Sequence, residues 1–391
     1  MRTGIVTVPL DYGRCPRWLF ERMKRLARGI TLAIVEEFGA DEALKRFSDP
    51  VWFQSLGCVI GFDWNSSGLT TITLGALKAA VFDIQDRLGL YVCGGKRESR
   101  KTPSEIEAYG ISRGFSFAPK LIYASKMAAK IDSSLIQDGY QIYQHNFLFT
   151  QSGKWTVIQQ GMNTENQTAR RYHWLSSGVK DFVEEPHSGI ISDIKLNPLN
   201  LTAKESKENR EISTELVKEE PKTFLKNIKL ACEKPAPYRT CSDSGSSNLI
   251  KQKRLANFCE MELNDVEFHW HPVLKEKFHL KRLEKIIFAV NSENPKNFEQ
   301  LLSLKGVGPK TIRALSLVAE IIYGAQPSYE DPARYSFTVG GKDGTPTPIN
   351  RPIYDKLLEI VEKGIGKSQI SIREKIEAQR RLSSFCPSLF S

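Results

Sequence analysis

The first strong pattern of hydrophobic and polar positions lies at residues 15–39, CPRWLFERMKRLARGITLAIVEEFG. Its apolar residues recur at the spacing of one helix face, with charged residues between them. Pro16 stands near the start of the stretch and Gly39 at its end, which are the positions where helices favour these residues. The pattern therefore predicts a helix that buries one face.

Shorter apolar runs follow this stretch. Residues 53–64, FQSLGCVIGFDW, form a β-rich run, and residues 69–89 are typical of a strand that passes into a helix. The segment GLYVCGG at residues 89–95 indicates another buried strand. We interpret these runs as parts of one mixed α/β unit.

The clearest β signal lies at residues 146–161, NFLFTQSGKWTVIQQG. Two β-rich runs flank Gln151, Ser152 and Gly153, and such a short polar, glycine-containing insert predicts a β-hairpin. This hairpin completes the α/β unit, which we assign to residues 1–190.

The composition changes after residue 190. Residues 201–220 predict a charged helix opened by Thr202, with Glu205 three residues later as in a capping box. A polar stretch, EKPAPYRTCSDSGSSN, is typical of a linker. The chain then becomes mostly helical, so the predicted fold class is α+β. The expected divisions are an α/β unit at residues 1–190, a charged helix and linker at 191–265, and a helical unit at 266–391.

A glycine-containing turn stands between two helical patterns at residues 304–324, LKGVGPKTIRALSLVAEIIYG. Residues 295–303 predict the first helix and residues 305–308 the turn. Pro309 occupies the first position of the second helix, where proline is tolerated. The sequence therefore predicts two helices joined by a tight turn.

This turn has the composition of a phosphate-binding site. Glycines allow the backbone to approach another surface, and the free amides of a helix start favour an anion. The motif resembles the helix-hairpin-helix, which grips the nucleic-acid backbone without reading sequence. The alternative is a plain connection between helices. The residues assigned to backbone binding are Lys305, Gly306, Gly308, Lys310, Thr311 and Arg313.

A second interpretation gives Lys310 a catalytic role. Helix-hairpin-helix glycosylases have a lysine at this place and an aspartate about twenty residues later, and Asp331 lies 331 − 310 = 21 residues on. A lysine can attack a sugar carbon while a carboxylate stabilises positive charge. The alternative is that Lys310 touches phosphate and that Asp331 caps the turn begun by Pro332.

Polar residues interrupt the apolar runs of the first 190 residues. Carboxylates at strand ends are how many nucleases hold a divalent metal, which activates water and stabilises charge on the scissile phosphate. The candidate catalytic residues are Asp63, Asp138, His145 and Gln160, and the candidate ligands of Mg²⁺ or Mn²⁺ are Asp63, Asp138 and Glu185. The alternative is turn capping by the two aspartates and a buried hydrogen-bond network for the glutamines.

A basic loop follows Gly94 and Gly95, in CGGKRESRKTPSEI. It lacks the order of a nucleotide-binding P-loop, so ATP binding is not indicated. Contact with phosphate and a solvated loop before a helix remain open. The residues assigned to DNA contact here are Lys96, Arg97 and Arg100.

Charge and composition fit such partners. The chain of 391 residues has a net charge of +10, which favours polyanionic ligands. None of its seven cysteines forms a C-x-x-C pair, so neither a zinc site nor a disulfide framework is expected. No apolar run approaches a membrane span and no signal peptide is seen, so we expect a cytoplasmic protein without a membrane partner. Homo-oligomerisation is left open.

Five segments together resemble the domain-of-unknown-function 763 family of archaea and thermophilic bacteria. They are GRCPRWLFERMKRLA, SDPVWFQSLGCVIGFDWNSSGLTT, GGKRESRKTPSEI, QDGYQIYQHNFLFTQSGKWTVIQQGMN and DPARYSFTVGGKDGTP. The resemblance covers most of the chain and implies a thermophilic microbial source and DNA processing. The family pattern has histidines where this chain has Asn65 and Val339, which bears on histidine-dependent metal chemistry near Asp63.

Three functions follow from the sequence. The first is a metal-dependent DNA nuclease of repair or recombination, in which the amino-terminal unit cuts and the turn at residues 305–308 grips the backbone. The second is a DNA glycosylase or lyase that uses Lys310 and Asp331. The third is a DNA-binding or scaffold protein without catalysis.

Overall fold

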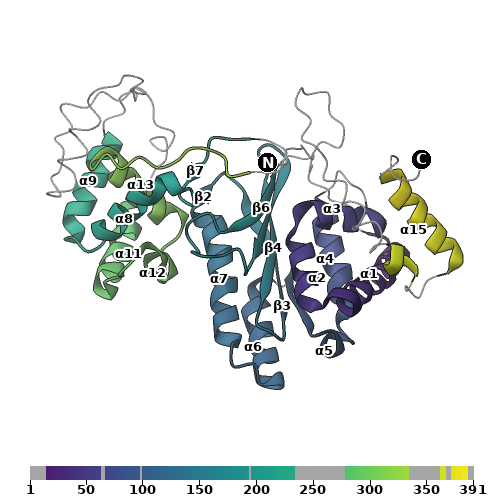
Figure 1. The fold of residues 1–391 in the computed structure, drawn as a ribbon. Coiled ribbons are helices and arrows are strands. Elements are labelled where there is room, and N and C mark those ends of the chain that lie inside the picture. The colour runs from purple at the N-terminus through teal and green to yellow at the C-terminus, as the bar shows by residue number, and fades with distance from the viewer. Residues whose placement is uncertain are drawn as a thin grey trace.

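The computed structural model describes residues 15–62, 67–96, 99–192, 195–233, 278–333, 362–366 and 371–385. Helices and antiparallel strands are both present, which confirms the α+β class (Figure 1). The helices are α1 (Arg17–Phe38), α2 (Ala40–Ser48), α3 (Pro50–Val59), α4 (Gly68–Val81), α5 (Gln85–Leu88), α6 (Thr102–Arg113), α7 (Ala118–Ser134), α8 (Lys207–Leu216), α9 (Pro221–Glu233), α11 (Leu280–Glu293), α12 (Phe298–Ser303), α13 (Pro309–Ile321) and α15 (Ile372–Phe385).

A five-stranded antiparallel sheet forms the centre of the molecule, in the order β1-β3-β4-β5-β6. A separate pair, β2 with β7, is also antiparallel. The strands are β1 (Leu90–Gly95), β2 (Ile136–Gln137), β3 (Gln141–Thr150), β4 (Trp155–Asn163), β5 (Thr168–Leu175), β6 (His187–Ser192) and β7 (Leu199–Asn200). The predicted hairpin at residues 146–161 is confirmed as β3 and β4, and the predicted strand at 89–95 as β1.

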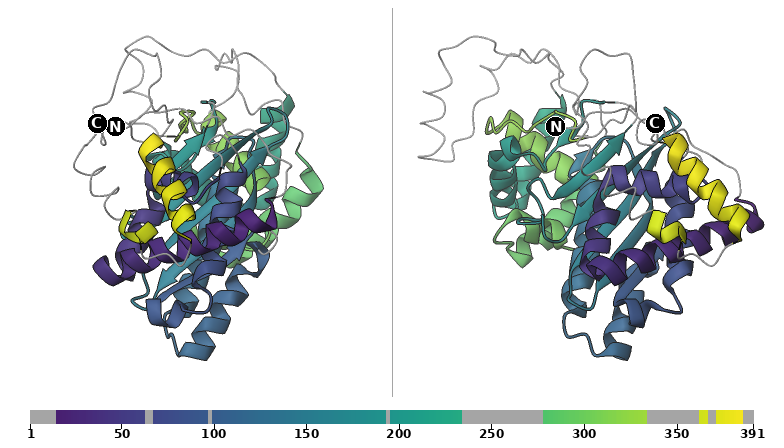
Figure 2. Two further views of the ribbon diagram at one scale, coloured as in Figure 1. Left: turned by 90° about the vertical axis from the view of Figure 1, so that its right-hand side faces the viewer. Right: turned by 45° about the vertical axis from the view of Figure 1, so that its right-hand side comes forward.

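Both faces of the sheet are covered by helices, as Figures 1 and 2 show. Because side chains alternate along a strand, Tyr91 and Cys93 of β1 join one core with α7, while Leu90 and Val92 join a second core with α1 to α4. We call these the α7 face and the α1 face of the sheet.

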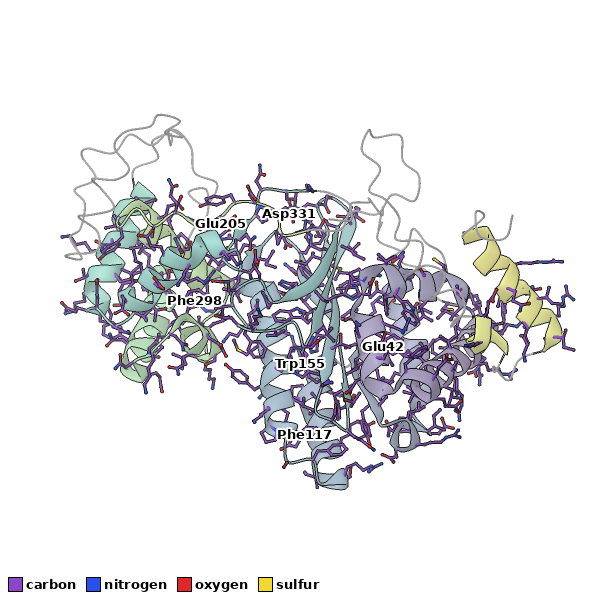
Figure 3. The ribbon with its side chains drawn as sticks, in the orientation of Figure 1. Glu42, Phe117, Trp155, Glu205, Phe298 and Asp331 are labelled. Carbon is purple, nitrogen blue, oxygen red and sulfur yellow. The ribbon has the colours of Figure 1, made fainter. Side chains whose placement is uncertain are left out.

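The core of the α7 face continues into the helices α8, α9 and α11 to α13. Trp155 of β4 and Phe298 of α12 belong to this one cluster, although they come from the sheet and from the outer helical group (Figure 3). The helix α7 therefore lies between the sheet and the predicted phosphate-binding turn.

The predicted β-rich run at residues 53–64 is wrong where the structure describes it, because Pro50–Val59 form the helix α3. Asp49 caps this helix by accepting hydrogen bonds from the amides of Val51 and Trp52, and Pro50 occupies its first turn. Nearly every residue of α3 is buried, so the run is apolar all round and lacks a helical stripe.

Two further predictions of local structure are wrong. The region 69–89 contains no strand and forms α4 and α5, with α4 buried between α1 and β1. The charged helix does not begin at Thr202, because the Thr202 hydroxyl donates to Asn200 Oδ1 at 2.7 Å. A short 3₁₀ turn, Lys204–Ser206, precedes α8 instead. The predicted helix at 15–39 is confirmed as α1, which ends at Gly39.

Candidate functional site

The turn between α12 and α13 comprises Leu304 to Gly308. Gly306 has a φ of +89°, in the left-handed region that favours glycine, and it lies against Ile286 of α11. Pro309 is the first residue of α13, and no side chain caps that helix start. The predicted turn and its proline are therefore present, while its use as a DNA-binding motif stays a prediction.

The structure separates the residues assigned to this turn. Lys305 and Lys310 are exposed, so their ammonium groups can reach a ligand. Thr311 is buried, and Arg313 is half-buried and donates to Gln137 Oε1. Gln137 Nε2 in turn donates to the Pro309 carbonyl at 2.9 Å, which fastens the start of α13 to β2.

The helix α7 holds the turn from its other side. Lys130 Nζ donates to the Leu304 carbonyl at 2.8 Å, and the Tyr123 hydroxyl donates to Glu299 of α12. Burial lowers the pKa of Lys130, which is half-buried. Lys126, one turn earlier on α7, is exposed. The turn and this part of α7 therefore adjoin, and Lys126, Lys305 and Lys310 contribute exposed ammonium groups to the surface of these segments.

A depression of about 330 Å³ opens on this surface, and we call it the basic depression. None of its lining residues is acidic. Its lining residues are Arg100, Pro103, Ser125, Lys126, Ala129, Lys130, Ser133 and His145. Arg100 comes from the basic loop after β1, so this loop lines the depression, and the turn is bonded to one of its lining residues, Lys130.

Gly94 explains how the basic loop reaches this position. Its φ is +84°, and a Cβ atom there would lie only 2.2 Å from the His145 carbonyl oxygen. Glycine therefore lets the end of β1 lie directly against β3 at His145. Lys96, two residues later, is exposed, and its Nζ lies 5.5 Å from the centre of the Tyr143 ring. Arg97 lies outside the described residues.

A chain of buried hydrogen bonds starts at the wall of the basic depression. Ser125 Oγ lies 2.9 Å from His145 Nε2, and His145 Nδ1 lies 2.8 Å from Gln159 Oε1. Gln159 Nε2 donates to the Ala128 carbonyl at 3.0 Å and to Asp132. These partners are two acceptors, so they fix the orientation of the amide and leave its oxygen facing His145.

The amide orientation also fixes the tautomer of His145. Because Gln159 Oε1 only accepts, Nδ1 must carry the hydrogen, and the neutral ring then presents the lone pair of Nε2 to Ser125. Burial lowers the pKa of His145, which favours this neutral form. The serine hydroxyl is therefore the donor to the imidazole.

From Asp132, near the carboxyl end of α7, the chain of hydrogen bonds continues to strands β5 and β6. Asp132 also accepts from Trp174 Nε1 at 3.0 Å and is paired with His187 Nε2 of β6. We call the five residues Ser125, His145, Gln159, Asp132 and His187 the polar relay. All five come from α7 and from three strands of the sheet.

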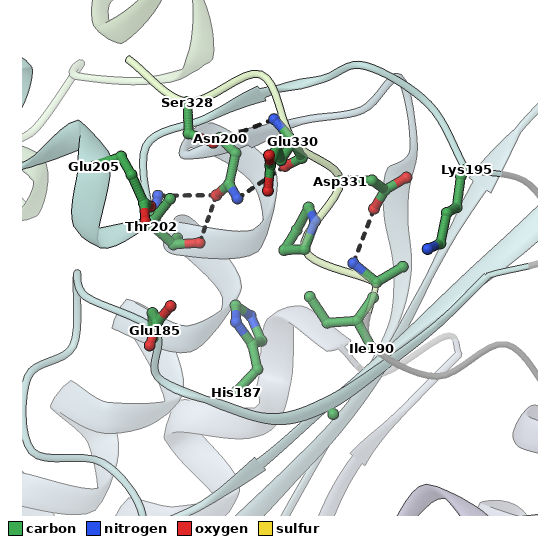
Figure 4. A pocket seen from close by; sticks show the side chains of 14 residues that line it. Glu185, His187, Ile190, Lys195, Asn200, Thr202, Glu205, Ser328, Glu330 and Asp331 are labelled. Carbon is green, nitrogen blue, oxygen red and sulfur yellow. Dashed lines mark hydrogen bonds between the residues drawn. The ribbon is translucent and has the colours of Figure 1, made fainter. Parts of the chain in front are cut away.

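His187 forms part of a second cavity, of about 270 Å³, which we call the acidic cavity (Figure 4). Glu185, Glu205 and Glu330 line it. Glu185 has a φ of +43°, and its amide donates to the Thr202 carbonyl at 2.8 Å. The polar relay thus runs through the protein from a basic opening to an acidic one.

Asp138 belongs to a different network on the same face of the sheet. Arg170 of β5 binds Asp138 Oδ2 at 2.8 Å and both carboxylate oxygens of Asp331, at 3.1 and 2.7 Å. The Tyr172 hydroxyl and the Tyr140 amide also donate to Asp138. We call Asp138, Arg170 and Asp331 the ion triad.

The three side chains of the ion triad are almost completely shielded from solvent. Burial on its own lowers the pKa of Arg170, but the carboxylates of Asp138 and Asp331 outweigh it and raise that pKa. Burial raises the pKa of Asp138 despite the nearby guanidinium. Asp331 also accepts from the amides of Leu196 and Ala333. Each carboxylate therefore already accepts hydrogen bonds from donors of the protein.

The predicted metal ligands do not form a cluster in the described part of the chain. Asp63 lies outside it, Asp138 is held in the ion triad, and Glu185 lines the acidic cavity. Across the ranges that the structure describes, no three His, Cys, Asp or Glu side chains are placed to hold a metal ion. The metal site stays a prediction, and Asp63 is the residue that decides it.

Gln160 cannot act together with His145. The neighbouring Gln159 points to the α7 face, so Gln160 points to the α1 face, where its Nε2 donates to the Ser67 carbonyl at 2.9 Å and to the Tyr143 hydroxyl. The sheet therefore separates these two candidate catalytic residues.

The sequence pattern points to His145 but not to its partners on α7. Ser125 and Asp132 are seven residues apart, which places both on one face of a helix. The remaining residues of that face include Leu121 and Ala128, which belong to the core. Two polar residues on an otherwise apolar helical stripe are the signal that could have revealed the relay.

Comparison with known proteins gives a family but no activity. The family model described as a protein of unknown function (DUF763) matches residues 4–349, so the chain belongs to this family. No curated protein and no solved structure matches the chain. Within the described ranges, no helix combines the length and apolar character needed to cross a membrane.

Proposed function

We propose that the protein binds the phosphate backbone of DNA with the basic surface formed by the α12–α13 turn, α7 and the loop after β1. The observation that carries this proposal is the bond from Lys130 to the Leu304 carbonyl, which joins the turn to the basic depression. The basic loop lines this opening through Arg100, and the turn, about 200 residues later in the sequence, is bonded to Lys130, which also lines it.

The basic surface has the features that phosphate binding requires. Lys305 and Lys310 are exposed on either side of the turn, and the uncapped start of α13 directs free amides to the same place. Arg100 and Lys126 extend the charge across the depression. Contacts of this kind position a backbone and carry no sequence information.

Charge reversal at the turn tests the proposal. The double variant Lys305→Glu/Lys310→Glu should bind labelled duplex DNA at least about tenfold more weakly at moderate salt, and its salt slope should fall by roughly two. A matched control is Lys45→Glu/Arg87→Glu, because both residues are exposed on the helices of the α1 face. Equal affinities and slopes for wild type and the turn variant would refute the proposal.

The metal-dependent nuclease remains a narrower proposal. It depends on Asp63, since Asp138 and Glu185 lie in separate surroundings. Labelled single-stranded, duplex and branched DNA should be incubated with Mg²⁺ or Mn²⁺, and with EDTA as the control. Cleavage that requires metal and is lost in Asp63→Asn would support it, whereas metal-independent cleavage would exclude it.

The glycosylase proposal receives less support from the site. The Asp331 carboxylate already accepts from Arg170 and from two amides, which leaves it poorly placed to act as a base. Borohydride trapping on damaged DNA decides the matter, because an adduct lost in Lys310→Gln is required. Without such an adduct, Lys310 serves to bind phosphate.

A further inference from the structure

The basic depression contains a serine and a histidine in the arrangement of a nucleophile and its base. Ser125 Oγ donates to His145 Nε2 at 2.9 Å, and the opposite ring nitrogen is held by Gln159 at 2.8 Å. A hydrogen-bonded serine, a base and a third residue that orients the base are the elements of nucleophilic catalysis. Both Ser125 and His145 line the depression, where they are 2% and 3% exposed.

The surroundings of this pair distinguish it from an ordinary buried hydrogen bond. Arg100, Lys126 and Lys130 line the same depression, and no lining residue carries a negative charge. A serine and histidine that only fill a core would not need cations around them. The polar relay also fixes which nitrogen of His145 faces the serine, which a purely packing role does not require.

We propose that Ser125 is a nucleophile that attacks a phosphoester held by Arg100, Lys126 and Lys130, with His145 as its general base. The substrate class rests on the proposed function, because a bound DNA backbone would bring phosphodiesters to this depression. Gln159 and Asp132 are positioning residues, since they act only through the orientation of His145.

The reaction balances with water as the only co-reactant. In the first step Ser125 Oγ forms a bond to phosphorus while an ester P–O bond breaks, and His145 Nε2 takes the serine proton and gives it to the leaving oxygen. In the second step water attacks the phosphoserine, the P–Oγ bond breaks, and the water proton returns through His145 to Ser125. The net change is hydrolysis of one phosphoester bond.

The cations favour phosphoryl transfer over acyl transfer. Ser125 lies inside α7, where backbone amides are bonded within the helix, so they cannot form an oxyanion hole. Arginine and lysine side chains instead supply positive charge where a phosphoryl group accumulates negative charge. The depression therefore suits a phosphoester better than a carboxylic ester.

A fluorophosphonate probe tests the nucleophile without any DNA. The full-length protein should be labelled at neutral pH, with loss of fluoride and formation of an Oγ–P bond, and peptide mass spectrometry should place the label on Ser125. Ser125→Ala should abolish it. His145→Asn should slow it about 10²- to 10⁴-fold, because Asn can still donate to Gln159 but lacks the basic nitrogen.

Ser133→Ala is the matched control. Ser133 lies on the same helix and lines the same depression, but its hydroxyl donates to the Lys130 carbonyl rather than to an imidazole. Labelling of this variant should equal that of wild type. No label on wild type, or a label that persists in Ser125→Ala, would overturn the proposal.

A separate measurement, of phosphodiester hydrolysis, tests the proposed substrate class. Hydrolysis of bis(p-nitrophenyl) phosphate in EDTA should release p-nitrophenolate with wild type and Ser133→Ala but not with Ser125→Ala. Ser125→Ala should bind DNA like wild type, because it removes no charge from the surface. DNA binding without labelling would overturn the nucleophile alone, whereas labelling and hydrolysis without DNA binding would overturn only the proposed function.

Discussion

The ion triad and the polar relay are two buried polar networks on the same face of one sheet, and they differ in how they end. In the triad, Arg170 lies between the carboxylates of Asp138 and Asp331, and nearby amides and a hydroxyl donate to these carboxylates, while Asp331 also lines the acidic cavity. The relay instead links two different openings, since Ser125 borders the basic depression and His187 the acidic cavity.

This difference separates a structural network from one that is suited to chemistry. A buried charge is costly unless it is paired and hydrogen-bonded, and each charge of the triad has such partners within the fold. The relay contains a hydroxyl, an amide and two imidazoles beside one carboxylate, and its end groups meet cavities. Polarity and burial alone would have ranked Asp138 and His145 equally as catalytic candidates.

The largest expected effect is on the ion triad. Arg170→Leu leaves Asp138 and Asp331 buried together without a cation, so the free energy of unfolding should fall by about 3–5 kcal/mol. Denaturant unfolding measures this loss. Arg28→Leu is the control, because Arg28 is paired with Asp83 at the surface and should change stability only slightly. Equal losses in both variants would show that the triad does not differ from a surface pair.

A medium effect is expected from two neighbouring glutamines. Gln159→Leu leaves the Nδ1 hydrogen of His145 without an acceptor, and Gln160→Leu removes donors from the Ser67 carbonyl and the Tyr143 hydroxyl. Each should lower the free energy of unfolding by roughly 1–3 kcal/mol.

Fluorophosphonate labelling should then distinguish the two variants. Only Gln159 orients His145, so Gln159→Leu should slow labelling of Ser125, while Gln160→Leu, on the α1 face, should not. If both variants slow labelling equally, the relay has no specific role and the effect is one of general stability.

The sequence predicts the helices and strands better than it predicts the difference between the ion triad and the polar relay. The hairpin of β3 and β4 and the helix α1 follow from local periodicity, whereas burial on all sides removes the helical stripe of α3, so its residues resemble a β-rich run. His145 was found as a candidate, but Ser125 lies twenty residues away and meets it only through the packing of α7 on β3. The sequence does not show that Arg170 binds Asp138 and Asp331 together, because these residues meet only through tertiary contacts.

The smallest effect concerns pH. Burial lowers the pKa of His145, so below pH 6.5 the unfolded chain binds a proton that the folded protein does not. Stability should therefore fall as the pH drops from 6.5 towards 5, by at most about 1.4 kcal/mol per pH unit for this residue.

His173 has the same dependence because burial also lowers its pKa, so His145→Asn should reduce the slope without abolishing it. Denaturant unfolding at several pH values between 7.5 and 5 measures both slopes. An unchanged slope in His145→Asn would mean that the imidazole titrates alike in the folded and unfolded protein. The relay would then not hold the neutral base that attack by Ser125 requires, although the ion triad would be unaffected.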